Sequence, residues 1–230
     1  FEKIEVVMKL ELIQPWSVPV VKTTLSPQVL QTMVEISDQT LDGENLEIDL
    51  DILKQRGVKD FFIDAVCQFV IVCKYQMLPH MIEEITQEKW MVQILSMWVV
   101  SQSPGEYAPL HMHKQCQISA VMYIKFPKML SSEKQHLGRG QGPLNLGPAL
   151  YNADGAIQFV NNAARDDSLC TPCITVSPKV GDFFIFGAHQ LHGVHPYYCE
   201  EGQEDVERRS IAFNANFISK TDYDRQHGRS

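Results

Sequence analysis

The period of the apolar residues changes at about residue 88, and this change limits the folds that the chain can adopt. Before it, apolar side chains recur at helical spacing. Ser26-Pro27 is typical of a helix start, because serine caps the first turn and proline fits its first position. The pattern predicts one helix to about residue 41, a second over about 59–77, and a short strand at 15–21. The second helix is expected to bury Phe62, Val66, Phe69, Val70 and Cys73 on one face.

After residue 88 the chain favours strands. In CQISAVMYIKF (116–126) apolar and mixed positions alternate, so Ile118, Met122 and Phe126 should face one side and Tyr123 the other. One or two strands are also expected at 89–102, mainly loop at 131–172, and further strands within 156–160, 173–178, 181–198 and 208–217.

Helices followed by many short strands predict an α+β fold that is mainly β. A chain of 230 residues is long enough for one sizeable core. We therefore expect a single domain over 1–230, in which 1–87 form a helical support and 88–220 form a β core that carries the functional site.

Composition excludes several classes of partner. The net charge is −8, and no dense run of Lys or Arg is available to contact a phosphate backbone, so no nucleic-acid partner is expected. The most apolar run, 61–73, contains Asp64 and Gln68 and is shorter than the roughly 18–20 residues that span a membrane. No signal-peptide pattern is present, so we expect a cytoplasmic protein. The chain begins with Phe1, not Met, which is compatible with an upstream segment.

The cysteines indicate no special chemistry. Cys170 and Cys173 form a CxxC pair, which occurs in redox sites and in half of a zinc site. The second half of a zinc site is missing and no thioredoxin-like βαβ pattern surrounds the pair. We expect ordinary reduced cysteines in a loop.

Five of the eight histidines lie in two short segments. His111 and His113 stand one residue apart before the strand at 116–126, and on a strand such a pair points to the same side. The second segment, GAHQLHGVHPYY, contains His189, His192 and His195. Because imidazole is a common ligand of iron and zinc, the two segments together predict a metal site.

The strand-like run ERRSIAFNANF adds a candidate anion site. On a strand, Arg208 and Ser210 share one face and Arg209 lies on the other. A guanidinium can bind a carboxylate with two hydrogen bonds, and a nearby hydroxyl can add a third. The alternative is a surface strand with two solvated arginines.

These segments together resemble the iron(II)- and 2-oxoglutarate-dependent dioxygenase superfamily. The similarity is carried by PLHMHKQCQISAVMYIKFP (109–127), GDFFIFGAHQLHGVHPYY (181–198) and ERRSIAFN (207–214), and it spans about 88–217. More narrowly, the chain resembles the prolyl-hydroxylase-like branch and, within it, a group of oxygenases from bacteria and phages.

The resemblance implies a double-stranded β-helix, or jelly-roll, with supporting helices. It implies iron ligands at His111, His113 and His192, although the family usually has Asp or Glu where this chain has His113. Three neutral imidazoles would leave the full metal charge to attract 2-oxoglutarate. The resemblance also implies that Arg208, Ser210 and Tyr123 bind 2-oxoglutarate.

The implied activity is hydroxylation of a C–H bond, with O2 consumed and succinate and CO2 released. The cofactors would be Fe(II) and 2-oxoglutarate as co-substrate, with ascorbate a possible auxiliary reductant. The partner would be a small-molecule or peptide substrate, and neither its identity nor the oligomeric state can be predicted. The loops at 131–172 and 198–207 are expected to frame the entrance, and the acidic composition of the second mildly favours a cationic or neutral substrate such as a peptide.

Two alternatives remain open at this stage. Three histidines also suit a zinc or cupin-type metalloenzyme, which needs a nearby carboxylate base, and Glu106 is the candidate. The second alternative is a jelly-roll binding module without catalysis, in which the histidines bind no metal.

Overall fold

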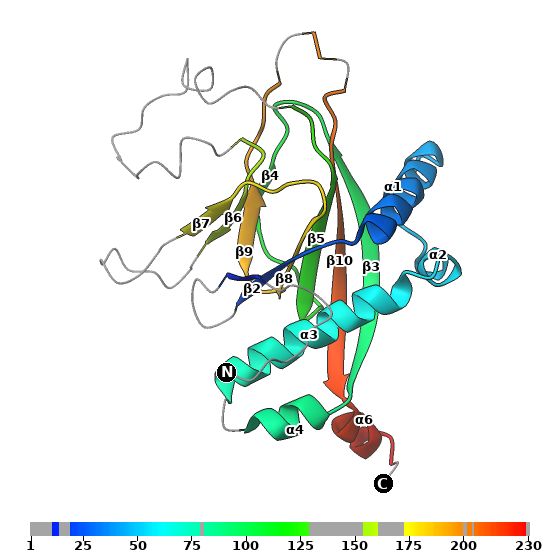
Figure 1. The fold of residues 1–230 in the computed structure, drawn as a ribbon, viewed down its shortest axis with the longest axis vertical. Helices are drawn as coiled ribbons and strands as arrows, with labels where there is room; N and C mark the ends of the chain where they lie inside the picture. Colours follow the sequence, from blue (N-terminus) through cyan, green and yellow to red (C-terminus); the bar gives the residue numbers. More distant parts are fainter. Residues whose placement is uncertain are drawn as a thin grey trace.

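Two antiparallel sheets form the body of the molecule (Figure 1). The structure is a computed structural model that describes residues 11–13, 19–78, 81–128, 154–160, 173–199, 202–203 and 205–228. The larger sheet has six strands in the order β1-β2-β8-β5-β10-β3, and the smaller has four in the order β4-β9-β6-β7. The predicted α+β, mainly β class is therefore confirmed.

The larger sheet comprises β1 (Glu11–Ile13), β2 (Val20–Thr24), β8 (Asp182–Gly187), β5 (Ile118–Lys125), β10 (Arg208–Ser219) and β3 (Trp90–Gln102). The smaller comprises β4 (Ala108–His111), β9 (Leu191–Val194), β6 (Ile157–Val160) and β7 (Cys173–Val176). The helices are α1 (Pro27–Asp42), α2 (Leu50–Gln55), α3 (Lys59–Met77), α4 (Ile82–Gln87) and α6 (Lys220–Gln226).

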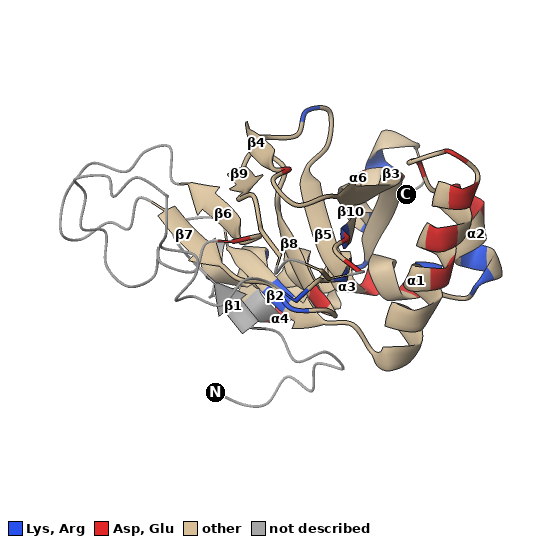
Figure 2. Cartoon of the chain, turned by 90° about the horizontal axis from the view of Figure 1, so that it is seen from above, with Lys and Arg blue, Asp and Glu red and all other residues tan. Residues whose placement is uncertain are grey.

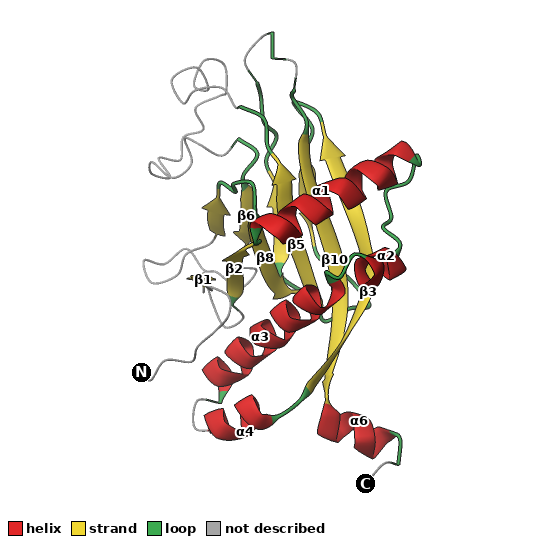
Figure 3. Ribbon diagram, turned by 45° about the vertical axis from the view of Figure 1, so that its right-hand side comes forward, coloured by secondary structure: helices red, strands yellow, loops and turns green. Residues whose placement is uncertain are grey.

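The two long helices lie against one face of the larger sheet (Figure 3). Helix α1 begins as predicted: Ser26 accepts a hydrogen bond from the backbone N–H of Val29, and Pro27 occupies the first turn. Helix α3 inserts Phe62 between Phe183 and Phe213 of the sheet, with the ring centroids 6.1 and 5.7 Å apart. This apolar layer holds the sheet rigid from behind.

Strand β5 separates two cores. As the alternation predicts, Ile118 and Met122 face the helices. Tyr123 faces the opposite way and packs with Phe159 of β6 and with Phe184 and Phe186 of β8. Phe126, expected on the helix side, packs instead in this second cluster, because β5 ends at Lys125 and the alternation ends with it. The second cluster joins the two sheets.

Strand β10 lies between β3 and β5 and pairs with both. The run at 89–102 forms one strand, β3, and a bulge interrupts its pairing between Asn214 and Ala215. The expected strand at 15–21 lies only partly within the described residues, where β2 begins at Val20. The short helices α2, α4 and α6 were not predicted.

Charged residues gather on the helices, while most of the smaller sheet carries none (Figure 2). No helix among the described residues is long and apolar enough to cross a membrane. In the acidic loop, the described carboxylates Asp205 and Glu207 both pair with Lys125, at 3.1 and 3.0 Å. Glu200, Glu201 and Glu204 of this loop lie outside the described residues, so an acidic entrance stays a prediction.

Candidate metal centre

His111 and His192 lie directly opposite each other on β4 and β9 of the smaller sheet. His113 follows two residues after His111 but lies beyond the end of β4. The expectation that one strand would carry both His111 and His113 is therefore wrong. The strand pairing is irregular between Ala108 and His111, and the backbone N–H of His113 donates to the carbonyl of Ala188, 2.9 Å away. This bond, rather than strand alternation, sets the position of His113.

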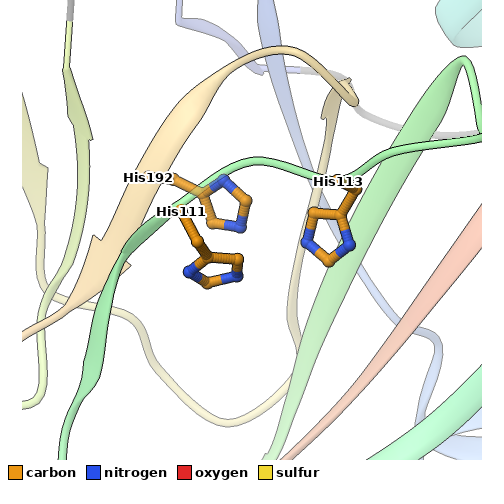
Figure 4. Close-up of side chains that lie close together, drawn as sticks. All are labelled: His111, His113 and His192. Carbon is orange, nitrogen blue, oxygen red and sulfur yellow. The ribbon is translucent and has the colours of Figure 1, made fainter.

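The three imidazoles converge on one point (Figure 4). One ligating nitrogen from each ring lies within 4.8 Å of the others, and no other group of three possible metal ligands among the described residues meets this spacing. The centroid of the His192 ring is 4.4 Å from that of His111 and 5.3 Å from that of His113. Three nitrogens at this separation can share one metal ion with only small rotamer changes.

Backbone carbonyls fix the orientation of two of the rings. The Nδ1 of His111 lies 2.7 Å from the carbonyl oxygen of Pro109, and the Nδ1 of His192 lies 2.8 Å from that of Gln190. Each contact is a hydrogen bond when the proton sits on Nδ1, which leaves Nε2 as the lone-pair donor. Metal-binding histidines in proteins are commonly held in this way.

The site favours the neutral form of His113 and His192. The pKa of His192 is lowered to about 4, mainly by burial and to a smaller extent by His111 and His113, while the hydrogen bond to Gln190 opposes the shift. Burial, with a smaller effect of His111, also lowers the pKa of His113. A neutral ring can donate its lone pair to a metal at pH 7 without first losing a proton.

The histidines open into a cavity of about 240 Å³ between the two sheets. Its walls are largely apolar and include Val100, Val121 and Phe186, and Trp98 of β3 lies against His113 with ring centroids 5.8 Å apart. Tyr123 and Ser210 also line it. The predicted metal ligands and two of the three predicted 2-oxoglutarate ligands thus share one cavity.

Arg208, the third predicted 2-oxoglutarate ligand, is 1% exposed and has no acidic partner among the described residues. Its Nη1 donates to the Oε1 of Gln102 at 2.5 Å, and its guanidinium lies over the rings of Tyr123 and Phe126, 5.0 and 5.7 Å from the centroids. Its Nε and Nη2 have no hydrogen-bond partner within the described part of the chain. A buried cation with two unused donors is costly unless an anion binds it.

Tyr123 and Ser210 flank Arg208 as cross-strand partners on β5 and β10. The hydroxyl of Tyr123 is buried and is likewise unpaired within the described residues. Burial raises the pKa of Tyr123, and the charge of Arg208 opposes this rise. Tyr123 is therefore a protonated hydrogen-bond donor. Arg209, on the other face of β10, binds Asp38, Ser37 and Glu207 and fixes α1 to the sheet.

The other described histidines lie outside this site. His189 is exposed in the turn before β9, His195 follows β9 and donates its backbone N–H to Ala156, and His227 ends α6. His80, His136 and Cys170 lie outside the described residues, and Cys173 is half-buried at the start of β7. Glu106 does not line the cavity, and its carboxylate accepts a hydrogen bond from the backbone of Ser103 at 2.6 Å.

Three contributing residues escaped the sequence analysis. Gln102 orients Arg208. The hydroxyl of Tyr197 holds the ends of β3 and β10 together, because it lies within hydrogen-bond distance of the carbonyls of Gln102 and Val206, to one of which it donates, and accepts from the N–H of Arg208. Trp98 forms the wall beside His113. Their roles depend on the pairing of strands that lie about a hundred residues apart in the sequence. Of the three, only Tyr197 had a signal in the sequence, because it belongs to the Pro-Tyr pair in the segment that contains His192.

A family model described as "Putative 2OG-Fe(II) oxygenase" matches residues 96–214. No curated protein matches the chain. Among solved structures, a prolyl-4-hydroxylase from Pseudomonas putida has 16% identity and a TM-score of 0.47, with 86% of this chain and 87% of that chain covered. AviO1 from Streptomyces viridochromogenes Tue57 has 10% identity and a TM-score of 0.49, with 86% and 89% covered.

Proposed function

The chain belongs to the 2OG-Fe(II) oxygenase family, and from this premise we propose that it is an Fe(II)- and 2-oxoglutarate-dependent hydroxylase. The proposed reaction converts a substrate C–H, O2 and 2-oxoglutarate into C–OH, succinate and CO2. One observation carries the proposal: a cluster of three histidines shares a cavity with a tyrosine and a serine that flank a buried, unneutralised arginine. The cluster suits a divalent metal and the arginine suits a dicarboxylate.

We propose His111, His113 and His192 as the metal ligands. Imidazole nitrogen is a suitable ligand for Fe(II), and three ligands leave positions for small molecules. No Asp or Glu among the described residues lines the cavity, so the metal would keep its full double positive charge. This charge favours a chelating dianion more strongly than a site with a carboxylate ligand would.

Arg208 would bind the distal carboxylate of 2-oxoglutarate. Because Gln102 occupies Nη1, the Nε and Nη2 edge is left to bind both carboxylate oxygens. The unpaired hydroxyl of Tyr123 supplies a third donor, and Ser210, opposite Tyr123, supplies a fourth. The anion would thus satisfy the unpaired buried donors of Arg208 and Tyr123.

When bound, Fe(II) and 2-oxoglutarate supply the oxidising chemistry of the reaction. The chain's own residues hold the reactants in place. His111 and His192 are oriented by carbonyls two residues earlier, and Arg208 by Gln102 and the aromatic rings. The apolar walls limit water around the reacting C–H bond. Trp98, beside His113, would bound the substrate side.

We also propose that the two facing sheets form a jelly-roll, with the site in the space between them. This topology is consistent with the strand orders β2-β8-β5-β10-β3 and β4-β9-β6-β7. The single-domain organisation over 1–230 stays a prediction, and so does a small-molecule or peptide substrate with no nucleic-acid partner.

The zinc hydrolase alternative is less favoured. Such an enzyme needs a carboxylate base beside the metal-bound water. Glu106, the sequence candidate, lies outside the cavity lining and is held by the backbone of Ser103. A binding module whose histidines bind no metal would not explain why a buried cation, Arg208, lies beside a cluster of three histidines.

Anaerobic titration of the metal-free protein with Fe(II) and then 2-oxoglutarate tests the proposal. A weak visible charge-transfer band is expected, because 2-oxoglutarate would chelate the metal. His192→Ala should abolish the band, whereas His189→Ala, which changes an exposed histidine three residues away, should leave it intact.

Arg208→Lys and Arg209→Lys form a matched pair of adjacent arginines on opposite faces of β10. Lysine keeps the charge but cannot bind a carboxylate with two parallel hydrogen bonds. Arg208→Lys should raise the Kd of 2-oxoglutarate at least tenfold at unchanged Fe(II) affinity, and Arg209→Lys should change neither. Fe(II) binding without the band would contradict the 2-oxoglutarate assignment, and absence of metal binding would contradict the whole proposal.

A further inference from the structure

Arg208 has a neutral partner where a buried cation usually has an acid. Charged side chains are almost never fully buried unless an opposite charge pairs with them. Here Gln102, the cross-strand partner of Arg208 on β3, accepts a hydrogen bond from Nη1 of the guanidinium at 2.5 Å. Glutamine and glutamate have the same shape and differ only at the end of the side chain, where an NH2 group replaces a charged oxygen. The pair is therefore arranged like a buried salt bridge but lacks the negative charge.

The acidic residues around this pair are committed to other cations. Glu207 directly precedes Arg208, but its Oε1 accepts from Nε of Arg209 at 2.6 Å. Asp182, a buried acid at the start of β8, lies 3.4 Å from Nζ of Lys22. Among the described residues no carboxylate is left to neutralise Arg208, so its charge remains available to a ligand.

The backbone around Gln102 is fixed independently of its side chain. Its carbonyl oxygen lies 2.6 Å from the hydroxyl of Tyr197, and the same hydroxyl accepts from the backbone N–H of Arg208 at 3.2 Å. Strands β3 and β10 also pair from this point onward. A substitution that changes only the end group of Gln102 should accordingly alter the charge beside Arg208 without moving the strands.

The missing negative charge affects which ligands the site accepts. A ligand with a carboxylate at its far end would neutralise Arg208, whereas a ligand with a methyl group there would leave the cation buried and unpaired. Sites built for a polar group reject analogues that lack it for this reason. A carboxylate in place of the Gln102 amide would neutralise Arg208 within the chain and repel the carboxylate of a ligand. The site would then lose its preference for a dianion.

We propose that Gln102 sets the charge specificity of the co-substrate site. Its neutral amide holds the guanidinium of Arg208 in place and leaves the charge uncompensated, so the site requires a second carboxylate on the 2-oxo acid. Gln102 is thus a positioning residue that acts through Arg208. The ligand-free chain is less stable as a result, because the cation stays buried without a counter-charge until a ligand binds. The inference rests on the proposed function for the identity of the ligand, whereas its effect on stability does not.

Two variants and two ligands test the inference. Gln102→Glu adds the missing charge at constant shape, and Gln102→Met removes the hydrogen bond without adding a charge. The ligands are 2-oxoglutarate and 2-oxopentanoate, a 2-oxo acid of the same length with a methyl group in place of the distal carboxylate. Their Kd values are measured under argon from the charge-transfer band of the Fe(II)-loaded chain. The matched control is Gln93→Glu, which makes the same charge change at an exposed position of β3.

Wild type and Gln93→Glu should bind 2-oxoglutarate about a hundredfold more tightly than 2-oxopentanoate, because a charged group gains or loses its partner. Gln102→Glu should reduce this preference to about tenfold or less by weakening 2-oxoglutarate and leaving 2-oxopentanoate unchanged. Gln102→Met should bind both ligands more weakly but keep the preference, because the charge of Arg208 remains. Affinity for Fe(II) should be equal in all four proteins.

Thermal unfolding of the metal-free chain at pH 7 provides a second readout, which needs neither iron nor 2-oxo acid. Gln102→Glu should raise the unfolding temperature by about 2 °C or more, because the new carboxylate pairs with Arg208. Gln102→Met should lower it, because Nη1 loses its acceptor. A side chain that serves only as a structural hydrogen-bond partner would not give shifts of opposite sign in the two variants.

Three results would overturn the inference: equal affinity of wild type for the two ligands, a preference for 2-oxoglutarate that survives in Gln102→Glu, or a Gln102→Glu chain that is less stable than wild type. Loss of the preference in Gln102→Met as well would assign specificity to the hydrogen bond and not to the charge. Failure of the oxygenase proposal is distinguishable, because wild type would then show no charge-transfer band with either ligand.

Discussion

At the scale of single residues, we expect the buried hydroxyl of Tyr123 to lower the stability of the ligand-free protein and to aid the binding of 2-oxoglutarate. Its buried O–H has no partner among the described residues, and such a group costs free energy in the ligand-free protein. Tyr123→Phe should therefore leave the free energy of unfolding unchanged or raise it by up to about 1 kcal/mol. The same change should raise the Kd of 2-oxoglutarate about tenfold, because a hydrogen bond to a carboxylate contributes about 1.5 kcal/mol.

Chemical denaturation and the charge-transfer titration measure these two quantities. Tyr75→Phe, which removes a hydroxyl from an exposed position on α3, should change neither. A loss of stability in Tyr123→Phe without a loss of affinity would show that the hydroxyl is structural, contrary to the proposed role.

Residue identity was the part of the site that the sequence predicted best. Residue type and short-range spacing predicted a metal site at the two histidine segments and an anion site at Arg208, and the family resemblance implied the individual ligands and Tyr123. The structure brings His111, His113, His192, Arg208 and Tyr123 to one cavity or its wall. Gln102 could not be found in this way. It meets Arg208 only because β3 and β10 pair in one register, and no local pattern in the sequence determines the register of strands so far apart.

At the scale of the elements, Gly193 permits the close approach of β9 to β4. A Cβ at this position would lie 3.0 Å from the carbonyl oxygen of Ala108 and 3.2 Å from the backbone nitrogen of Leu110. Gly193→Ala should push the strands apart and separate the facing His111 and His192. We expect at least a tenfold loss of Fe(II) affinity and a loss of stability of about 1–3 kcal/mol.

Calorimetric Fe(II) titration under argon and denaturant unfolding measure the effect of Gly193→Ala. The control is Gly43→Ala, where the nearest atom to an added Cβ is 3.4 Å away and φ is −82°. Equal metal affinity in wild type and Gly193→Ala would mean that the separation of β4 and β9 does not set the geometry of the site.

The junction of β10 with α1 should make stability depend on pH. Burial raises the pKa of Glu207, but hydrogen bonds from Arg209, Ser101 and Lys125 outweigh it and lower the pKa to about 2. Since the pKa is near 4.5 in an unfolded chain, the stabilisation is fully present above about pH 4.5 and is lost as the pH falls toward 2. Glu207→Gln should therefore cost about 1–2 kcal/mol at pH 7, allowing for partial exposure.

Urea unfolding of wild type and Glu207→Gln at pH 7, 5 and 3.5 tests this dependence. The difference in the free energy of unfolding between wild type and Glu207→Gln should be the same at pH 7 and pH 5 and smaller at pH 3.5. Glu47→Gln, an exposed carboxylate without an ion pair among the described residues, should show no such trend. A constant difference at all three values would assign the loss to packing rather than to charge.

The two predicted long helices and the predicted strands within 156–160, 173–178 and 181–198 agree with the structure, whereas the short helices had not been predicted. The helices expected to about residue 41 and over about 59–77 are α1 and α3. Each has four or more turns, so the apolar pattern repeats often enough to be recognised in the sequence. Helices α2, α4 and α6 span six or seven residues, less than two full turns, and so give no clear period. The end of β4 before His113 was missed because hydrogen bonding to Ala188, not residue type, determines it.

At the scale of the whole molecule, the metal would connect two sheets that are otherwise supported unequally. Helices cover the back of the larger sheet, whereas the smaller sheet is held through the cluster around Phe159 (Figure 3). His111 and His192 belong to the smaller sheet, and His113 lies on the segment that leads into β5 of the larger. One ion bound by all three would therefore tie the sheets together.

Fe(II) under argon should accordingly raise the unfolding temperature of the metal-free chain. At a hundred times its Kd a ligand adds about 2.7 kcal/mol, and for a chain of this size that corresponds to about 5–10 °C. Scanning calorimetry measures the shift, a chelator should reverse it, and His192→Ala but not His189→Ala should abolish it.

Hydrogen exchange should slow in β4, in β9 and over 112–117 more than in β3 or β10, because the latter are already paired and backed by helices. Uniform slowing would mean that the ion stabilises the whole molecule without joining the two sheets, and no slowing in β9 would remove His192 from the ligand set.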